Sequence, residues 1–150
     1  MAEVLAIVSA AIAVAQVTDR IVAACKAYIT SFQNAPSHLR VVLVEISTLK
    51  PICDNIQFLV DAESNTSTST RVSTKLQKPI EECHLLTKEL EKLFPSEVTR
   101  EAGHSSKRRK LKASLEQLAW PFKEHKAKRY LDDIRLLKET ISLELTLQSL

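Results

Sequence analysis

The chain of 150 residues contains a single glycine, Gly103. Glycine supplies the positive φ angles of tight hairpin turns and allows the close backbone approach found in phosphate-binding loops. A chain with only one glycine can scarcely build a β-sandwich, a dinucleotide-binding turn or a P-loop. Leu, Ala, Glu and Lys, which are helix formers, dominate the composition instead. We therefore expect an all-α protein.

Apolar residues that recur at helical spacing predict one domain, a helical bundle of four to five helices with an apolar N-terminal helix. Pro51 is expected to kink or split the second helix, and Pro79 to kink the third or to mark its start. The tripeptide Trp120-Pro121-Phe122 is expected to separate the last two helices. The expected helices span residues 2–32, 37–62, 72–94, 107–119 and 123–147, and the polar run 64–70 is expected to be a loop.

The N-terminal segment carries no charge between Glu3 and Asp19. Three interpretations compete for it: a secretory signal, a membrane-active helix, or a helix buried in a soluble core. The first residues, Met-Ala-Glu, are acidic where a signal peptide carries positive charge. The uncharged residues 4–18 would cover about 22 Å as a helix, against a bilayer core of about 30 Å. Partial membrane insertion and burial in a core both remain open.

Basic residues are concentrated in one part of the chain. Residues 100–129 hold 10 Lys/Arg and 3 Asp/Glu, a net charge of +7, whereas the remaining residues hold 11 and 15, a net charge of −4. Such clusters attract anionic lipid at about 1 kcal/mol per basic residue. They are also compatible with a solvated loop and helix face. Nucleic acid is not an expected partner, because aromatic residues are scarce and no binding motif appears. The candidate lipid-contacting residues are Lys107, Arg108, Arg109, Lys110, Lys112, Lys123, Lys126, Lys128 and Arg129.

No pattern in the sequence indicates catalysis, a metal site or a cofactor. The widely spaced Cys25, Cys53 and Cys83 lie on apolar helical faces, as structural thiols of a reducing compartment do. None of the four histidines has a second His or Cys three or four residues away, as a metal site on a helix would prefer. The acidic pairs 81–82 and 132–133 are interpreted as solvated faces. We therefore expect a protein that is not an enzyme.

Three stretches resemble a known family. They are the opening MAEVLAIVSAAIAVAQV, the Asn34-Ala35-Pro36 turn into a long helix, and the closing LAWPFKEHKAKRYLDDIRLLKETISLELTLQSL. Together they resemble the HeLo-like N-terminal domain of fungal STAND proteins, over nearly the whole chain. The WPFKE stretch and the Leu-rich helix after it are the most specific part. The resemblance implies a helical bundle at the N-terminus of a NOD-like receptor, followed in the full-length chain by a NACHT or NB-ARC module.

The resemblance also implies a role in programmed cell death, as in heterokaryon incompatibility and innate immunity. Such domains are cytoplasmic, form homo-oligomers on activation, and release an N-terminal helix that permeabilises the plasma membrane. Their partners would be further copies of the chain, anionic lipids and the NACHT or NB-ARC region. An adaptor with a permanently buried first helix is the alternative, and a regulator that keeps its receptor closed is another. Carried over to this sequence, the inserting residues would be Val4, Leu5, Ile7, Val8, Ile12 and Val14.

Overall fold

The computed structural model describes residues 2–31, 37–64, 71–94 and 120–149, and the helices in these ranges confirm the all-α expectation. The expected helix 107–119, residues 65–70 of the expected loop 64–70 and the Asn34-Ala35-Pro36 turn lie outside the described residues, whereas Ser64 of that loop ends a helix. The described helices are α1 (Ala2–Ser31), α2 (Ser37–Ser47), α3 (Leu49–Ser64), α4 (Arg71–Glu91) and α7 (Trp120–Ser149).

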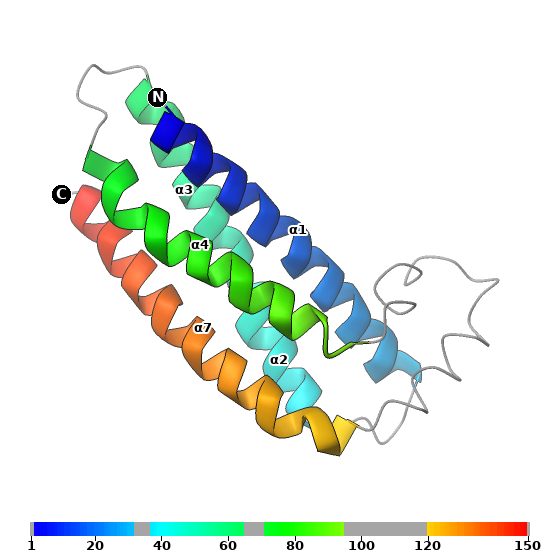
Figure 1. Cartoon of the computed structure of the whole chain (residues 1–150). Coiled ribbons are helices and arrows are strands. Elements are labelled where there is room, and N and C mark those ends of the chain that lie inside the picture. Colours follow the sequence, from blue (N-terminus) through cyan, green and yellow to red (C-terminus); the bar gives the residue numbers. More distant parts are fainter. Residues whose placement is uncertain (1, 32–36, 65–70, 95–119, 150) are drawn as a thin grey trace.

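The described helices form a bundle of four parallel and antiparallel rods, because α2 and α3 follow each other as one rod (Figure 1). The α1 and α4 helices run in one direction, whereas the α2–α3 rod and α7 run in the other. Helix α1 packs against α4 and against the α2–α3 rod, and α7 packs against the same two neighbours. Helices α1 and α7 therefore occupy diagonal corners of the bundle.

Each rod buries one seam of residues spaced alternately three and four apart. In α1, for example, the seam includes Ile7, Ala11 and Val14. This spacing averages 3.5 residues and is typical of helices that pack with knobs in holes. The seam of the α2–α3 rod continues through the break between its two helices, which keeps both on the same core. The remaining seams comprise Leu39, Val42, Ile46, Leu49, Cys53, Ile56 and Val60 in α2–α3, Leu76, Ile80, Cys83, Thr87, Leu90 and Phe94 in α4, and Ala127, Leu131, Ile134, Ile141 and Leu145 in α7.

The second expected helix is split, and the break lies at Thr48 rather than at Pro51. Pro51 belongs to the first turn of α3, where a missing backbone N–H leaves no hydrogen bond unmade. Hydroxyl groups cover the carbonyls freed at the end of α2. Ser47 Oγ donates to the Val44 carbonyl at 3.0 Å, and Thr48 Oγ1 donates to the Glu45 carbonyl at 2.8 Å.

Two other expectations about prolines are corrected by the structure. Pro79 lies inside α4 and does not mark the start of that helix. The Trp120-Pro121-Phe122 tripeptide belongs to the first turn of α7, which begins at Trp120 rather than at residue 123. A proline in the first turn fits the φ angle of a helix and lacks only an N–H that has no intrahelical acceptor there.

Candidate functional site

Helix α1 contains the one stretch in the described part of the chain that is long and apolar enough to cross a membrane, Leu5–Thr30, with 26 residues. Core helices of soluble proteins and signal sequences share these properties of length and composition. The position of each side chain in the bundle is therefore what distinguishes the interpretations of α1.

The structure divides five of the six residues expected to insert into a membrane between two faces of α1. Ile7 and Val14 are fully buried in the core seam, and Val8 is half-buried. Leu5 is 67% exposed and Ile12 is 42% exposed, so these two point away from the core. The backbone of Val4 is helical, and its side chain lies outside the description. Leu5, Val8 and Ile12 form a continuous stripe, because residues three or four apart are neighbours on a helix.

The seam of α1 holds the helix firmly in the core. Besides the residues of its first turns, the seam contains Ile21, Cys25 and Tyr28, and Val17 is buried beside it. Full burial of an Ile or Val side chain contributes about 1.5–3 kcal/mol, so the four buried Ile and Val residues of α1 together contribute about 6–12 kcal/mol. This is comparable to the whole stability of a typical domain, about 5–15 kcal/mol. Helix α1 can leave only if another environment covers the same side chains.

Two ion pairs connect the middle of α1 to its neighbours. Arg20 Nε donates to Glu91 Oε2 of α4 at 2.8 Å, and Lys50 Nζ of α3 donates to Asp19 Oδ1 at 3.1 Å. Both pairs are solvent-exposed, so each contributes about 1 kcal/mol or less. They separate an uncharged segment, residues 4–18, from a second half of α1 that is anchored by charge.

The structure does not bring Lys126, Lys128 and Arg129 close to the N-terminus of α1. Lys126, Lys128 and Arg129 are exposed near the start of α7, whereas the side chain of Lys123 and residues 107–112 lie outside the description. The start of α7 lies at the end of the bundle where α1 finishes, opposite the end where α1 begins (Figure 1). The folded bundle therefore presents these three cations and the exposed apolar stripe of α1 at opposite ends.

Lys138 of α7 is a charged residue of the core that the sequence analysis did not identify. It occupies a seam position between Ile134 and Ile141, and only 14% of its side chain is exposed. Its Nζ donates to Glu45 Oε2 at 2.7 Å, to the Glu45 carbonyl at 3.1 Å and to Thr48 Oγ1 at 2.5 Å. The lysine thus satisfies the backbone where α2 ends. The position of Lys138 in the three-four spacing of α7 is the sequence signal that could have identified it as a core residue.

The carboxylate of Glu45 is the acceptor at the centre of this cluster. The hydrogen bond from Lys138 holds the pKa of Glu45 below its ordinary value, against the opposing effect of burial, and Arg135 adds to the lowering. Arg135 Nη2 lies 2.9 Å from Glu45 Oε1. The cluster ties α7 to the C-terminal end of α2.

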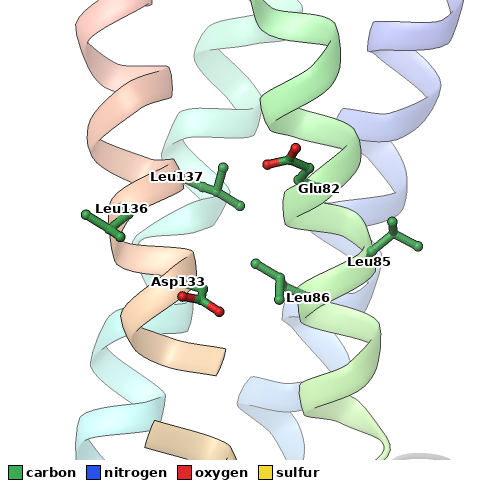
Figure 2. A pocket seen from close by; sticks show the side chains of 6 residues that line it. All are labelled: Glu82, Leu85, Leu86, Asp133, Leu136 and Leu137. Atoms are coloured by element: carbon green, nitrogen blue, oxygen red, sulfur yellow. The ribbon is translucent and has the colours of Figure 1, made fainter. Parts of the chain in front are cut away.

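A groove of about 430 Å³ opens between α4 and α7 (Figure 2). Four leucines form much of its lining, and one carboxylate stands on each wall. The consecutive acidic pairs, which were interpreted as solvated faces, are exposed, and one acid of each pair, Glu82 and Asp133, also lines this groove. We call it the α4–α7 groove, and its lining residues are Glu82, Leu85, Leu86, Asp133, Leu136 and Leu137. A second groove, of about 400 Å³, lies between α3 and α7 beside the exposed Phe58.

The three thiols are buried and unpaired with one another. Burial raises the pKa of Cys25, Cys53 and Cys83 to about 12, so each is a protonated and unreactive thiol at neutral pH. Among residues 2–31, 37–64, 71–94 and 120–149, no group of three or more His, Cys, Asp or Glu residues could hold a metal ion.

Comparison of the chain with models of protein families, with curated proteins and with solved structures finds no match in any of the three.

Proposed function

We propose that this domain is a membrane-permeabilising effector of cell death, in which self-assembly releases the first half of α1 into a lipid bilayer. The observation that supports this proposal is the division of α1 at Asp19. Residues 4–18 are uncharged and carry an exposed apolar stripe, whereas the next two charges, Asp19 and Arg20, are paired with α3 and α4. No enzymatic step is part of the proposal.

The energetics of release favour lipid over water as the destination of this segment. Ile7 and Val14 would lose a large hydrophobic stabilisation on leaving the core for water. In a bilayer the same side chains are again removed from water, so this loss is largely offset. The cost that remains is the newly exposed surface of α4 and of the α2–α3 rod. Contacts between copies of the domain would cover that surface, which links release to self-assembly.

The length of the segment fixes how deeply it inserts. Residues 4–18 cover about 22 Å as a helix, less than the bilayer core of about 30 Å. Asp19 and Arg20 then stay at the lipid–water boundary, where their charges remain hydrated. A short segment of this kind thins the bilayer around it, and several together permeabilise it.

The exposed cations near the start of α7 indicate which class of lipid the domain would bind. Lys126, Lys128 and Arg129 attract anionic headgroups at about 1 kcal/mol each. They lie at the opposite end of the bundle from Leu5 (Figure 1). A bundle bound through these cations reaches the bilayer with α1 only after the first half of α1 has left the core. The domain would thus move from the cytoplasm to the plasma membrane on activation by its nucleotide-binding receptor module, as in the fungal receptors it resembles.

A second candidate function is an adaptor that binds other proteins and keeps α1 buried. The uninterrupted seam from Ile7 to Tyr28 favours this candidate, since it gives α1 the same packing as the other helices. The adaptor would need no lipid, so membrane activity separates the two candidates.

Dye release from phosphatidylserine vesicles tests the proposal. We expect the chain to release dye, and we expect Leu5→Glu/Ile12→Glu to abolish release with unchanged helicity and only a small loss of stability, because both side chains lie outside the core. Leu143→Glu/Leu147→Glu is the matched control, since it adds two carboxylates at exposed leucines of α7. No release by the parent chain would favour the adaptor, and equal release by all three proteins would contradict the role of the α1 stripe.

A further inference from the structure

The α4–α7 groove combines an apolar lining with two carboxylates that have no cation. Neither Glu82 nor Asp133 forms an ion pair with another described residue. The two acids stand on opposite walls of the groove, with the side chains of Leu86 and Leu137 also directed toward it (Figure 2). Two like charges beside an apolar surface favour an occupant that brings both a cation and apolar side chains.

Among the residues that the structure describes, α2 carries an element of this kind. Val41 and Val44 are both exposed, and the exposed Arg40 precedes them. Arg40 and Val44 share a face because they are four residues apart on a helix. Arg40 has no acidic partner among the described residues. We call Arg40, Val41 and Val44 the α2 ridge.

The other exposed apolar residues fit the groove less well. Phe58 lies on the same face of α3 as Asp54 and Asp61, which the groove carboxylates would repel. Leu143 and Leu147 follow Glu139 and Glu144 at helical spacing and meet the same repulsion. The stripe of α1 at Leu5 and Ile12 carries no cation. An arginine can bind two carboxylates through its planar fork of donors, as Arg40 would between Glu82 and Asp133.

We infer that the α4–α7 groove binds the α2 ridge of a second copy of this chain. The ridge and the groove are different surfaces, so the contact is head-to-tail and generates a ring or a filament. The α2–α3 rod stands diagonally from α4 in the bundle, which leaves one copy able to use its ridge and its groove together (Figure 1). This inference names the contact between copies that the proposed function requires. The biological role of the assembly therefore rests on the proposed function.

Sedimentation velocity of the whole chain over a range of concentrations, without lipid, tests the contact. We expect Glu82→Lys/Asp133→Lys to weaken self-association about 100-fold, since it places like charges opposite Arg40. The matched control is Glu81→Lys/Asp132→Lys, which makes the same change of charge one residue away from the groove on each helix. Circular dichroism checks that both variants fold. Equal association constants for the two variants, or a parent chain that stays monomeric at its highest soluble concentration, would overturn the inference.

Charge exchange separates a specific contact from a general charge effect. We expect Arg40→Glu alone to be monomeric, and its addition to Glu82→Lys/Asp133→Lys in one chain to restore association. An equimolar mixture of the ridge variant Arg40→Glu/Val44→Asp with the groove variant Glu82→Lys/Asp133→Lys should give dimers that do not extend, because only one contact stays intact. Larger assemblies in that mixture, or no complex, would contradict the head-to-tail arrangement.

The outcome is independent of whether the domain permeabilises membranes. Groove variants that stay monomeric in solution but release dye like the parent chain would overturn the role of this contact in assembly and leave the membrane proposal standing. A parent chain that assembles through the groove without releasing dye would support the contact and overturn the membrane proposal.

Discussion

Helices α1 and α7 have the same length, 30 residues, and occupy diagonal corners of the bundle, yet their seams differ in kind. The seam of α1 is apolar except for Thr18, whose hydroxyl is buried without a hydrogen-bond partner. The seam of α7 includes Lys138, which binds three acceptors at the end of α2. Removing α7 from the bundle breaks a charged cluster, whereas removing the first half of α1 breaks only apolar contacts. The same packing geometry thus produces one helix suited to transfer into lipid and one suited to stay.

The largest expected effect compares the two faces of α1. Ile7→Glu buries a carboxylate at a position with no exposed surface and should lower the free energy of unfolding by more than about 4 kcal/mol. Ile12→Glu makes the same chemical change on the exposed stripe and should cost about 0.5 kcal/mol. Denaturant titration followed by circular dichroism measures both. Similar losses for the two variants would show that α1 does not pack through the Ile7 seam.

Lys138 provides the corresponding test in α7. Lys138→Ala should cost about 2–3 kcal/mol, because the Glu45 carboxylate and carbonyl lose a charged donor and the core loses the aliphatic part of the side chain. Lys138→Met keeps most of that volume, and Arg135 still pairs with Glu45, so it should cost less than half as much. Thermal unfolding distinguishes the two. If Met were as damaging as Ala, the ion pair rather than packing would fix α7.

The pH dependence of stability reports the same cluster. The pKa of Glu45 lies below its ordinary value of 4.5 in the folded protein, chiefly because of the hydrogen bond from Lys138. The stabilisation is therefore fully present above the unfolded pKa and is lost as the pH falls through the lower folded pKa. Stability should decline with acidification below about pH 4.5. Glu45→Gln should flatten this acid limb in unfolding measured at successive pH values, and an unchanged slope would place the titrating group elsewhere.

Substitution of Thr18 is expected to change the free energy of unfolding least, and to raise it rather than lower it. Its buried Oγ1 has no partner, so Thr18→Val replaces an unsatisfied hydroxyl by a methyl group of similar size. We expect the variant to be more stable by about 1 kcal/mol. Thr87→Val in α4 is the control, because Thr87 Oγ1 donates to the Cys83 carbonyl at 2.9 Å. A destabilised Thr18→Val chain would show that the Thr18 hydroxyl has a polar role in the core.

The fold was largely predictable from the sequence, because its determinants are local. A single glycine and the helical spacing of Leu39, Val42 and Ile46 suffice to predict helices and an all-α bundle. The break at Thr48 was not predictable, since it depends on hydroxyl groups and on Lys138 from α7 rather than on Pro51. The start of α7 was missed because a Trp-Pro-Phe sequence is compatible with both a break and a first turn.

The site was less predictable than the fold. Residues 4–18 are apolar on nearly every face, so their sequence does not show which side chains face the core, and Ile7 and Ile12 are indistinguishable by type. Glu82 and Asp133 stand 51 positions apart in the chain, and only the packing of α4 on α7 brings them to one groove. Contacts between distant helices depend on the order of the rods in the bundle, which local spacing does not encode.

A distance measurement between α1 and α4 tests the release of the first half of α1 most directly. Positions 12 and 78 are exposed, so Ile12→Cys and Lys78→Cys would each present an accessible thiol for a spin label. The native thiols are buried, which makes the labelling selective. Pulsed electron paramagnetic resonance would compare the chain in solution with the chain on phosphatidylserine vesicles, and a Lys26→Cys/Lys78→Cys pair would serve as the control in the anchored half. We expect the distance from position 12 to change on vesicles while the distance from position 26 stays constant. An unchanged distance from position 12 on vesicles that leak would contradict the account.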